Sequence, residues 1–291
     1  MTVQLTTSDL LARGTAALAS VLEWPSLDAA ILLAFCLGVP PVRLKSHPEE
    51  PRTAADQERY LALIERRAQG EPLAYITGVR EFWTLQLRVT RDVLVPRPET
   101  ELLVERALSL VPAPTARVLD LGTGSGAIAL ALAAERPEWE ILASDASAAA
   151  LAVARDNARR LRLANVSFHT GSWFSGLTEQ RFDLVLSNPP YVDARDPALL
   201  ALKEEPLQAL TPGSDALADL RTIIREAPQH LRAGGWLALE HGAAQAEAVA
   251  HELVARGFGS VRSHRDLGGH ERVTEGHWPR IAPPQSQGSS S

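Results

Sequence analysis

The sequence predicts an α/β protein in which a small helical domain precedes a larger domain built on a mostly parallel sheet. From Arg117 onward, short apolar runs alternate with helix-like stretches, which is the pattern of parallel strands joined by crossover helices. The first 70 residues show helical periodicity alone. Between these two regions, apolar and polar residues alternate from Arg80 to Val95, which indicates a β-hairpin.

The length also favours two domains, because 291 residues are about twice the ~150 residues of a typical domain. We predict a helical domain over 1–79, a β-hairpin linker over 80–97, the sheet-containing domain over 98–280 and a flexible tail over 281–291. The tail is predicted from its run of Pro, Gln, Gly and Ser.

Composition and charge exclude several classes of protein. Hydrophobic residues make up 45% and charged residues 22%, so we expect a globular core and not a disordered chain. The formal charge of -6 argues against a basic nucleic-acid surface, and we expect no stable nucleic-acid partner. Cys36 is the only cysteine and lies in an apolar run, which predicts a buried thiol and no disulfide within the chain.

The sequence shows no targeting or membrane segment. Residues 1–9 lack the basic and apolar regions of a secretory signal, and no apolar run reaches the ~18 residues of a membrane helix. The eight histidines are scattered without ligand spacing, so no metal site is predicted. We therefore expect a soluble, cytoplasmic protein that binds no membrane.

Three helices are predicted in the first domain from cap residues, apolar spacing and terminal glycines. No set of catalytic residues occurs in this domain. It is therefore either a compact structural module or a lobe that recognises a partner. The expected helix bounds are Ser8 or Asp9 to Ser20, Ser26 to Gly38, and Thr53 to Gly70.

The linker is predicted as a hairpin followed directly by a helix. Residues 83–90 alternate between apolar and polar as in a half-buried strand, and Val93–Val95 would form the returning strand. Pro98 and the acidic residues after it suit the first turn of a helix that runs to Leu110.

The second domain is predicted to alternate strands with helices. The strand cores are Val118–Leu121, Glu140–Ser144, Val166–Phe168, Phe182–Leu186, Gly235–Glu240, Ser260–His264 and Glu271–Thr274. The helix-like stretches are Ala127–Ala134, Ser147–Leu161, Ser214–Leu231 and Ala243–Arg256. We expect the last two strands to pair antiparallel at the edge of the sheet.

A glycine-rich loop follows the first of these strands and opens directly into a helix. It consists of Gly122, Thr123, Gly124, Ser125 and Gly126, and is called the glycine loop below. Alternate glycines let backbone approach a ligand closely at the carboxyl edge of a sheet, where α/β folds bind ligands. The spacing is neither the dinucleotide fingerprint nor a P-loop. The loop therefore predicts a site for a nucleotide cofactor that lacks a pyrophosphate.

Two acidic residues stand at strand ends near this loop. Asp145 ends the second strand of the domain, where an acid accepts hydrogen bonds from ribose hydroxyls; the alternative is that it caps the helix that begins at Ser147. Asp120 precedes the glycines and is predicted to orient the loop backbone or to meet a cationic ligand. Its alternative is a solvated acid at a strand end.

The turn Asn188-Pro189-Pro190-Tyr191 comes soon after the strand that ends at Leu186. Proline fixes the backbone and removes donors, so the neighbouring carbonyls are free to accept hydrogen bonds. The Asn188 side-chain oxygen and the Pro189 carbonyl can accept both hydrogens of one planar NH2 group, while Tyr191 supplies a ring to stack against it. The turn predicts a site for an amino nitrogen, and a stiff surface turn is the alternative.

Together, the glycine loop, Asp145 and the Asn-Pro-Pro-Tyr turn resemble the class I S-adenosylmethionine-dependent methyltransferases that methylate amino nitrogens. More narrowly, the chain resembles the PrmC/HemK family of release factor glutamine methyltransferases from about Asp28 to about Trp278. Departures are small, since Ser125 replaces a frequent threonine and Thr211–Gly213 a usual diglycine, so only local loop geometry is in doubt. The further segments that carry the resemblance are Glu71–Gly78, Val93–Glu101, Glu205–Pro206, Ala209–Leu210 and Glu271–Thr274.

The resemblance implies a Rossmann-like methyltransferase domain with a seven-stranded sheet, S-adenosylmethionine as cofactor and class I peptide chain release factors as protein substrates. The glycine loop, Asp145, Trp173 and Asn188 would bind the cofactor, with Trp173 covering the adenine. The first domain would recognise the substrate, and we expect a monomer. The residues implied to bind the target glutamine are Asn188, Pro189, Pro190 and Tyr191, of which Asn188, Pro189 and Tyr191 are the predicted catalytic residues.

The predicted reaction is methylation of the side-chain amide nitrogen, N5, of the glutamine in the Gly-Gly-Gln motif of release factors. A nucleic-acid methyltransferase acting on adenine or guanine uses the same kind of turn and is the alternative. The net charge and the absence of a basic stretch with interleaved aromatic residues argue against it. A non-enzymatic binding module is disfavoured by the intact glycines, Asp145 and the complete turn.

Overall fold

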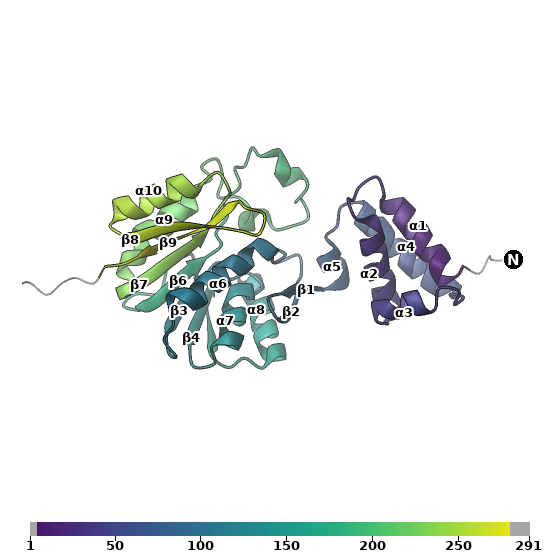
Figure 1. Cartoon of the computed structure of the whole chain (residues 1–291), viewed down its shortest axis with the longest axis horizontal. Coiled ribbons are helices and arrows are strands. Elements are labelled where there is room, and N and C mark those ends of the chain that lie inside the picture. Colours follow the sequence, from purple (N-terminus) through teal and green to yellow (C-terminus); the bar gives the residue numbers. More distant parts are fainter. Residues whose placement is uncertain (1–4, 280–291) are drawn as a thin grey trace, which may run out of the picture. The chain divides into compact units, whose positions relative to one another are not determined.

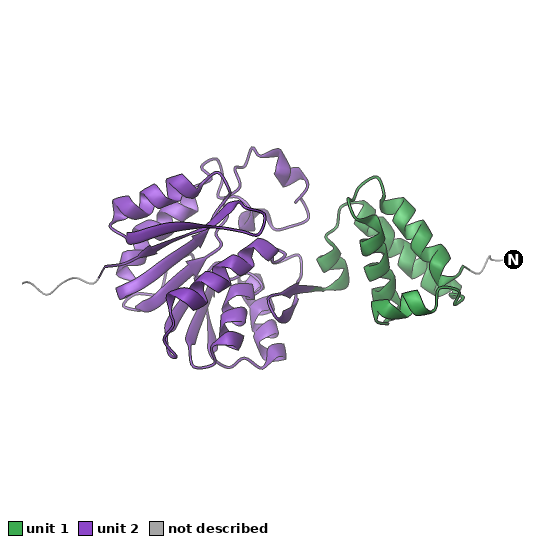
Figure 2. Cartoon of the chain, viewed as in Figure 1, with its two compact units in different colours: residues 1–79 green, residues 80–291 purple. Residues whose placement is uncertain are grey.

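The chain is described by a computed structural model over residues 5–279 (Figure 1). It divides into two compact units, residues 1–79 and residues 80–291, which are coloured separately in Figure 2. The tail predicted over 281–291 lies outside the described residues.

The first unit is a small helical bundle whose core contains the fully buried side chains of Leu10, Leu32, Leu33 and Tyr60. Cys36 is a free thiol that is only partly buried, so the expectation of a buried thiol is wrong. The helices are α1 (Thr7–Leu18), α2 (Pro25–Leu37), α3 (Pro41–Ser46), α4 (Ala54–Ala68) and α5 (Leu73–Thr77). The two short helices α3 and α5 were not predicted, because so few residues show no helical period.

Two of the three predicted helix starts in this unit are wrong by one to three residues. Thr6 caps α1 in a capping box with Asp9, so the helix begins earlier than predicted. Pro25 occupies the first position of α2, and Ser26 therefore lies inside the helix. Thr53 caps α4 as predicted, because its hydroxyl accepts a hydrogen bond from a backbone amide of the first turn.

The second unit begins with a two-stranded sheet of β1 (Val79–Phe82) and β2 (Leu85–Arg88). Trp83 lies between the strands with φ 55°, a conformation typical of tight turns. The returning strand predicted at Val93–Val95 is wrong. The Val95 amide donates to the Glu205 carboxylate at 3.0 Å, so a side chain and not a neighbouring strand holds this segment.

A seven-stranded sheet forms the centre of the second unit, with strand order β5-β4-β3-β6-β7-β9-β8. Neighbouring strands from β5 to β7 are parallel, whereas β9 pairs antiparallel with both β7 and β8. The predicted mostly parallel sheet and its antiparallel pair are confirmed. The strands are β3 (Arg117–Leu121), β4 (Glu140–Asp145), β5 (Val166–Thr170), β6 (Phe182–Ser187), β7 (Leu231–Glu240), β8 (Gly259–Arg265) and β9 (Glu271–His277).

Helices cover both faces of this sheet (Figure 1). Val118 of β3 packs in one apolar cluster with α6, α7 and α8, whereas its neighbour Leu119 packs in a second cluster with α9 and α10. Alternate strand residues thus face opposite helical layers. The helices are α6 (Glu101–Leu110), α7 (Ala127–Glu135), α8 (Ala148–Leu161), α9 (Ala218–Glu226) and α10 (Ala246–Arg256), with 3-10 turns η1 (Pro98–Thr100), η2 (Pro197–Leu200), η3 (Leu207–Ala209) and η4 (Ala227–Gln229).

The order of the strands reverses between β3 and β6, which are parallel neighbours. Strands β4 and β5 extend the sheet on one side of this pair, and β7 extends it on the other. Open α/β sheets bind ligands at the carboxyl ends of the strands at such a reversal. Because the glycine loop follows β3 and the Asn-Pro-Pro-Tyr turn follows β6, the topology brings both motifs to this place.

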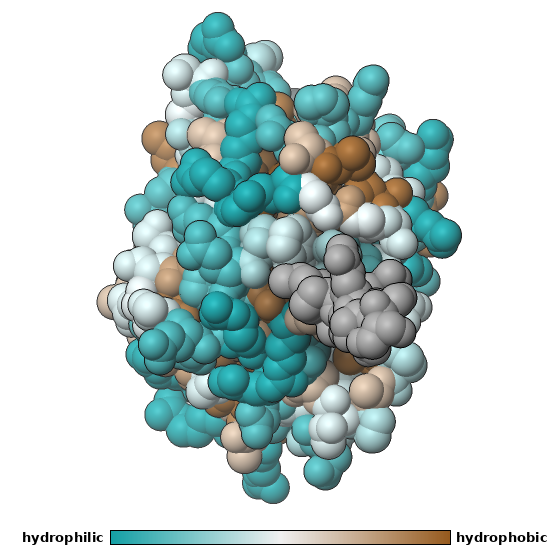
Figure 3. All heavy atoms as spheres, turned by 90° about the vertical axis from the view of Figure 1, so that its left-hand side faces the viewer, coloured by the Kyte–Doolittle hydropathy of each residue, from teal (hydrophilic) through white to brown (hydrophobic). Residues whose placement is uncertain are grey.

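The surface is mostly polar on the face drawn in Figure 3, with smaller apolar areas. Among residues 5–279, no helix is long and apolar enough to cross a membrane. The large apolar side chains that remain exposed in the described part of the chain are Val21, Trp24, Leu27, Phe35, Val42, Leu200, Leu207, Val254 and Leu267.

Candidate active site

A cavity of about 370 Å³ opens at the carboxyl ends of the parallel strands. Segments that follow β3, β4, β5 and β6 all contribute to its wall, together with residues from 92–100 and 206–209 and Asp219 of α9. No group of three or more His, Cys, Asp or Glu within residues 5–279 is placed to hold a metal ion. The wall of the cavity consists of hydrogen-bonding groups and apolar surfaces.

Most of the predicted site residues line this cavity. Those in the wall are Gly122, Thr123, Gly124, Ser125, Asp145, Trp173, Asn188 and Pro190. The structure does not bring Gly126, Pro189 or Tyr191 into the wall, although each is next to a residue that lines it. The binding roles of all these residues stay predictions, including those that line the cavity.

The glycine loop needs glycine for two different reasons. Gly122 and Gly124 have φ of 69° and 55°, which side chains rarely permit, and a Cβ on Gly124 would meet no atom within 4 Å. Backbone is therefore exposed to the cavity. A Cβ on Gly126 would lie 2.9 Å from Leu130, so this glycine permits the close packing of α7 behind the loop.

The Asp145 carboxylate accepts hydrogen bonds from two backbone segments that line the cavity. One carboxylate oxygen accepts from the Gly124 amide at 2.9 Å and the other from the Ser147 amide at 2.8 Å. Ser147 itself caps α8 by accepting from Ala150, so the alternative role of Asp145 as the helix cap is wrong. Each carboxylate oxygen keeps a lone pair that can accept a further hydrogen bond.

Asp120 lies behind the loop and is completely buried. Its Oδ2 accepts from the Thr123 hydroxyl at 2.6 Å and from the Ala129 amide at 3.3 Å. Burial raises the pKa of Asp120 to about 7, against the lowering effect of these two hydrogen bonds. Asp120 therefore orients the loop, as predicted, and the alternative of a solvated acid is wrong.

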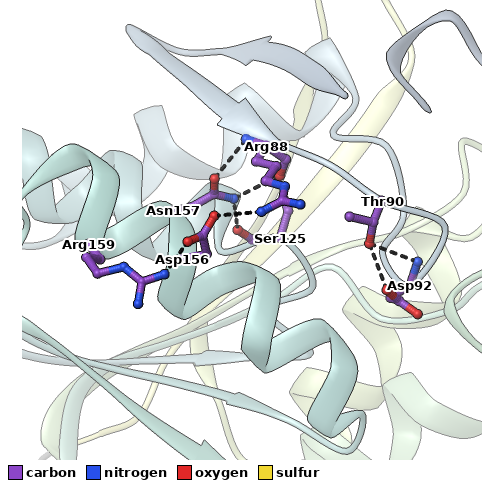
Figure 4. A network of polar contacts seen from close by, with 7 residues as sticks. All are labelled: Arg88, Thr90, Asp92, Ser125, Asp156, Asn157 and Arg159. Atoms are coloured by element: carbon purple, nitrogen blue, oxygen red, sulfur yellow. Dashed lines mark hydrogen bonds and ion pairs between the residues drawn. The ribbon is translucent and has the colours of Figure 1, made fainter. Parts of the chain in front are cut away.

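Asn157 supports the loop from α8 and was not predicted as a site residue. Figure 4 shows its amide between the backbone of Arg88 and that of Ser125. Asn157 Nδ2 donates to both carbonyls at 2.9 Å, and its Oδ1 accepts from the Arg88 amide at 2.7 Å. A polar residue on the apolar face of a predicted helix was the available signal.

Trp173 follows β5 and lies beside the glycine loop. Its φ angle is 48°. A Cβ on Gly122 would lie 3.7 Å from its ring, which places the indole directly across from the glycine loop. Asp219 of α9 lines the same part of the cavity. Burial raises the pKa of Asp219, while a hydrogen bond with Trp173 lowers it.

The Asn-Pro-Pro-Tyr turn is fixed to the neighbouring strand and to η1. The Ser187 hydroxyl just before it donates to the Leu121 carbonyl at 2.8 Å, which holds the ends of β3 and β6 together. Asn188 Nδ2 donates to the Thr100 hydroxyl oxygen at 3.1 Å. With its NH2 group engaged in this way, Asn188 keeps Oδ1 as the acceptor for a ligand.

Tyr191 is not part of the cavity wall, and its side chain is bound to the end of β7. The hydroxyl donates to Glu240 Oε1 at 3.3 Å, and the Tyr191 carbonyl accepts from Gln245 Nε2 at 3.0 Å. Burial raises the pKa of Tyr191, so the phenol stays neutral. The predicted stacking of its ring on the substrate amide stays a prediction.

An ion pair between Arg97 and Glu205 lies at another part of the cavity wall. We did not predict this pair from the sequence. Arg97 Nη2 lies 2.5 Å from Glu205 Oε1, and the Glu205 side chain is only 1% exposed. Arg97 and Pro206 both line the cavity. Because 108 positions separate Arg97 from Glu205, no local pattern could pair them.

Comparison with known proteins assigns both units. Residues 9–78 match the family model "PrmC N-terminal domain", and residues 98–270 match "Methyltransferase small domain". A Pseudomonas aeruginosa protein named release factor glutamine methyltransferase is 51% identical over 256 residues, which is 87% of this chain and 92% of that protein. A protein of the same name from Escherichia coli K12 is 44% identical over 258 residues, 88% of this chain and 93% of that protein.

Solved structures share the fold at low sequence identity. A methyltransferase from Pyrococcus furiosus has a TM-score of 0.53 at 19% identity, over 74% of this chain and 97% of that chain. The hMettl16 catalytic domain in complex with an RNA hairpin has a TM-score of 0.57 at 17% identity, over 91% of both chains. The fold is thus that of methyltransferases, and the identity with the bacterial proteins over most of both sequences shows that this chain belongs to the release factor glutamine methyltransferase family.

Proposed function

We propose that this protein uses S-adenosylmethionine to methylate the side-chain N5 of the glutamine in the Gly-Gly-Gln motif of class I peptide chain release factors. The observation that carries the proposal is one cavity walled by both the glycine loop and the Asn-Pro-Pro-Tyr turn. Family membership supports a release factor as the substrate. S-adenosylmethionine supplies an electrophilic methyl carbon on a sulfonium sulfur.

The residues around the cavity fit this cofactor. Its volume lies within the range of about 300 to 1,000 Å³ that is usual for small-molecule sites. Gly124 exposes backbone, and the spare lone pairs of Asp145 suit ribose hydroxyls. Trp173 offers an aromatic face opposite the loop for the adenine.

The Asn-Pro-Pro-Tyr turn suits a primary amide that must react at nitrogen. The amide lone pair is delocalised into the carbonyl, so alignment with the methyl carbon is the main requirement. Asn188 Oδ1 and the Pro189 carbonyl would each accept one amide hydrogen. These acceptors stabilise the positive charge that develops on nitrogen more than they stabilise the neutral ground state. One amide proton then leaves to water.

The first unit is proposed to recognise the protein substrate. Trp24 and Leu27 at the start of α2 are 69% and 58% exposed, and Phe35 further along α2 is 47% exposed. Aromatic and apolar side chains of this kind are enriched in protein interfaces. A lobe with its own core and no catalytic residues is well suited to such a role.

Peptide mass mapping tests the reaction. A class I release factor is incubated with enzyme and S-adenosylmethionine and then digested. We expect one methyl group on the glutamine of the Gly-Gly-Gln peptide. Asn188→Ala should lower turnover ~100-fold or more, because it removes a transition-state acceptor. Calorimetry on the same variant shows how far cofactor binding has survived.

Parallel reactions with radiolabelled cofactor address the alternative substrate. DNA and ribosomal RNA are offered under the same conditions as the release factor. Methyl transfer to either nucleic acid, with none to the glutamine, would replace this proposal by a nucleic-acid methyltransferase.

A further inference from the structure

Arg97 presents hydrogen-bond donors at the wall of the cavity. Its side chain is 33% exposed and forms part of the lining. A guanidinium group carries five N–H donors in one plane. Within residues 5–279, the Arg97 guanidinium makes one hydrogen bond, from Nη2 to Glu205 Oε1. Its remaining donors are therefore available to a ligand in the cavity.

Glu205 holds this guanidinium group in place. The Glu205 side chain is only 1% exposed, and both of its carboxylate oxygens are engaged. Oε1 accepts from Arg97 at 2.5 Å, and Oε2 accepts from the Val95 amide at 3.0 Å. A buried carboxylate bound at both oxygens cannot turn freely, so the group that it binds is fixed as well. Donors fixed in advance lose little conformational entropy when a ligand binds.

The backbone connects Arg97 to the Asn-Pro-Pro-Tyr turn. The Thr100 amide donates to the Arg97 carbonyl at 3.1 Å, which closes the 3-10 turn η1. The Thr100 hydroxyl oxygen accepts from Asn188 Nδ2 at 3.1 Å. Pro206, which directly follows Glu205, lines the same cavity as Arg97 and Asn188. Arg97 is thus one turn of backbone away from the partner of the residue proposed to hold the target amide.

The charge of Glu205 decides which kind of acceptor suits Arg97. A second carboxylate, such as that of the cofactor, would bind close to the negative charge of Glu205 at a site with little solvent to screen it. A neutral carbonyl oxygen meets no such repulsion and gains a charge-assisted hydrogen bond. The ion pair therefore favours carbonyl oxygens as the ligands of Arg97.

The proposed substrate segment offers such oxygens. The two glycines of Gly-Gly-Gln have no side chain, so only their main-chain groups can be recognised. Resting on the proposed function, we infer that Arg97 is a specificity-determining residue that binds main-chain carbonyl oxygens of this segment, with Glu205 as its positioning residue. In a helix or sheet these oxygens are already paired. Arg97 thereby selects a glutamine in an irregular loop over a glutamine in regular structure.

Steady-state methylation of a full-length release factor gives the first test. Arg97→Ala should lower kcat/KM about 10- to 100-fold, mainly through KM, because hydrogen bonds from a charged donor are lost. Calorimetry should show an unchanged affinity for S-adenosylmethionine. Arg97→Lys keeps a positive charge opposite Glu205 but not the planar set of donors, so kcat/KM should fall while thermal unfolding stays near that of the unmodified protein.

Arg91→Ala is the matched control. Arg91 Nη1 lies 2.8 Å from Glu204 Oε2, so this ion pair joins the same two segments as Arg97 and Glu205. Arg91 does not line the cavity. The control should therefore keep the kcat/KM for the release factor.

Peptides with altered main-chain carbonyls give the second test. Each synthetic peptide contains Gly-Gly-Gln with one carbonyl oxygen replaced by sulfur, which is a weaker acceptor. Binding is measured as inhibition of release factor methylation, so the peptide need not be a good substrate. At least one replacement should weaken binding to the unmodified protein and have no effect in Arg97→Ala, as in a double-mutant cycle.

Each outcome decides a specific point. Sulfur effects that are absent, or equal in the unmodified protein and Arg97→Ala, would overturn the inference while the proposed function stands. A large loss of cofactor affinity in Arg97→Ala, with the KM for the release factor unchanged, would overturn it too and assign Arg97 to the cofactor carboxylate. If the unmodified protein leaves the glutamine unmethylated, the proposed function and this inference are overturned together.

Discussion

Hydrogen bonds within the protein fix the orientation of the Asp145 side chain. Both carboxylate oxygens accept backbone amides, one from the glycine loop and one from the turn before α8. The carboxylate is thus held in one orientation with its remaining lone pairs available. A group fixed in advance loses little conformational entropy when a ligand arrives.

We predict that Asp145→Ala weakens S-adenosylmethionine binding by roughly 1 to 3 kcal/mol, the range for hydrogen bonds to a charged group. Isothermal titration calorimetry measures this change. Asp156→Ala is the matched control, because Asp156 on α8 pairs with the side chains of Arg88 and Arg159. Equal affinity for Asp145→Ala and the control would remove Asp145 from the cofactor site.

Asp120 should make the folded protein less stable as the pH rises, the opposite of the usual effect of an aspartate. Its folded pKa of about 7 lies above its ordinary value of 3.8, so its contribution to stability is complete below about pH 4 and is lost as the pH rises to 7. In Asp120→Asn this loss disappears. From pH 4 to 8, the unmodified protein should lose up to about 4 kcal/mol relative to the variant.

Urea unfolding of both proteins at several pH values measures this difference. Two stability curves that run parallel from pH 4 to 8 would show that Asp120 is ionised in the folded protein.

At the scale of elements, α8 carries a polar group on the side that faces the core. Asn157 is 1% exposed and joins α8 to the backbone of β2 and of the glycine loop. Three backbone groups form hydrogen bonds with this one amide (Figure 4). The position of the loop is therefore set by a helix that does not itself contain the glycines.

Replacing Asn157 by Leu should destabilise the second unit by roughly 2 to 4 kcal/mol, because three backbone groups, among them the buried Ser125 carbonyl, lose a hydrogen bond. Cofactor affinity should fall as well, since the loop loses its support. Thermal unfolding and calorimetry give the two quantities. Arg159→Ala, an exposed change on the same helix, should stay within about 0.5 kcal/mol; a similar loss in both variants would contradict the role of Asn157.

From the sequence we could predict the elements that a pattern of neighbouring residues determines. Strands β3 and β6 are mostly apolar runs with a clear end, and the glycine loop and the Asn-Pro-Pro-Tyr turn follow them. The segment Val93–Val95 has the same apolar pattern, but it was predicted wrongly because Glu205 and not a strand binds it. Arg97 and Glu240 contact partners far away in the sequence, and such pairings leave no mark on nearby residues. Asn157 did leave a signal, as a polar residue on the apolar face of a helix.

At the scale of the whole molecule, we propose that the first unit recognises the substrate and that the second unit performs the chemistry. We predict that the double variant Trp24→Ser, Leu27→Ser raises the KM for a full-length release factor. The KM for a short Gly-Gly-Gln peptide should not change, because a peptide has no surface to engage the first unit. Steady-state methylation with both substrates measures this.

Val254→Ser on α10 is the control for this prediction. Val254 is 61% exposed and lies in the second unit, so the change removes a comparable apolar side chain elsewhere. An equal rise in KM for protein and peptide in the double variant would mean that the first unit has another role.

The position of β9 affects when this protein can fold during translation. β9 is the last strand within residues 5–279, yet it lies between β7 and β8. Until residues 271–277 have left the ribosome, β7 has an unpaired edge, which is a place where other chains can attach. Glu240 ends β7 and pairs with Val273 of β9. Because Tyr191 donates to Glu240, the surroundings of the Asn-Pro-Pro-Tyr turn are completed only after β9 has been synthesised.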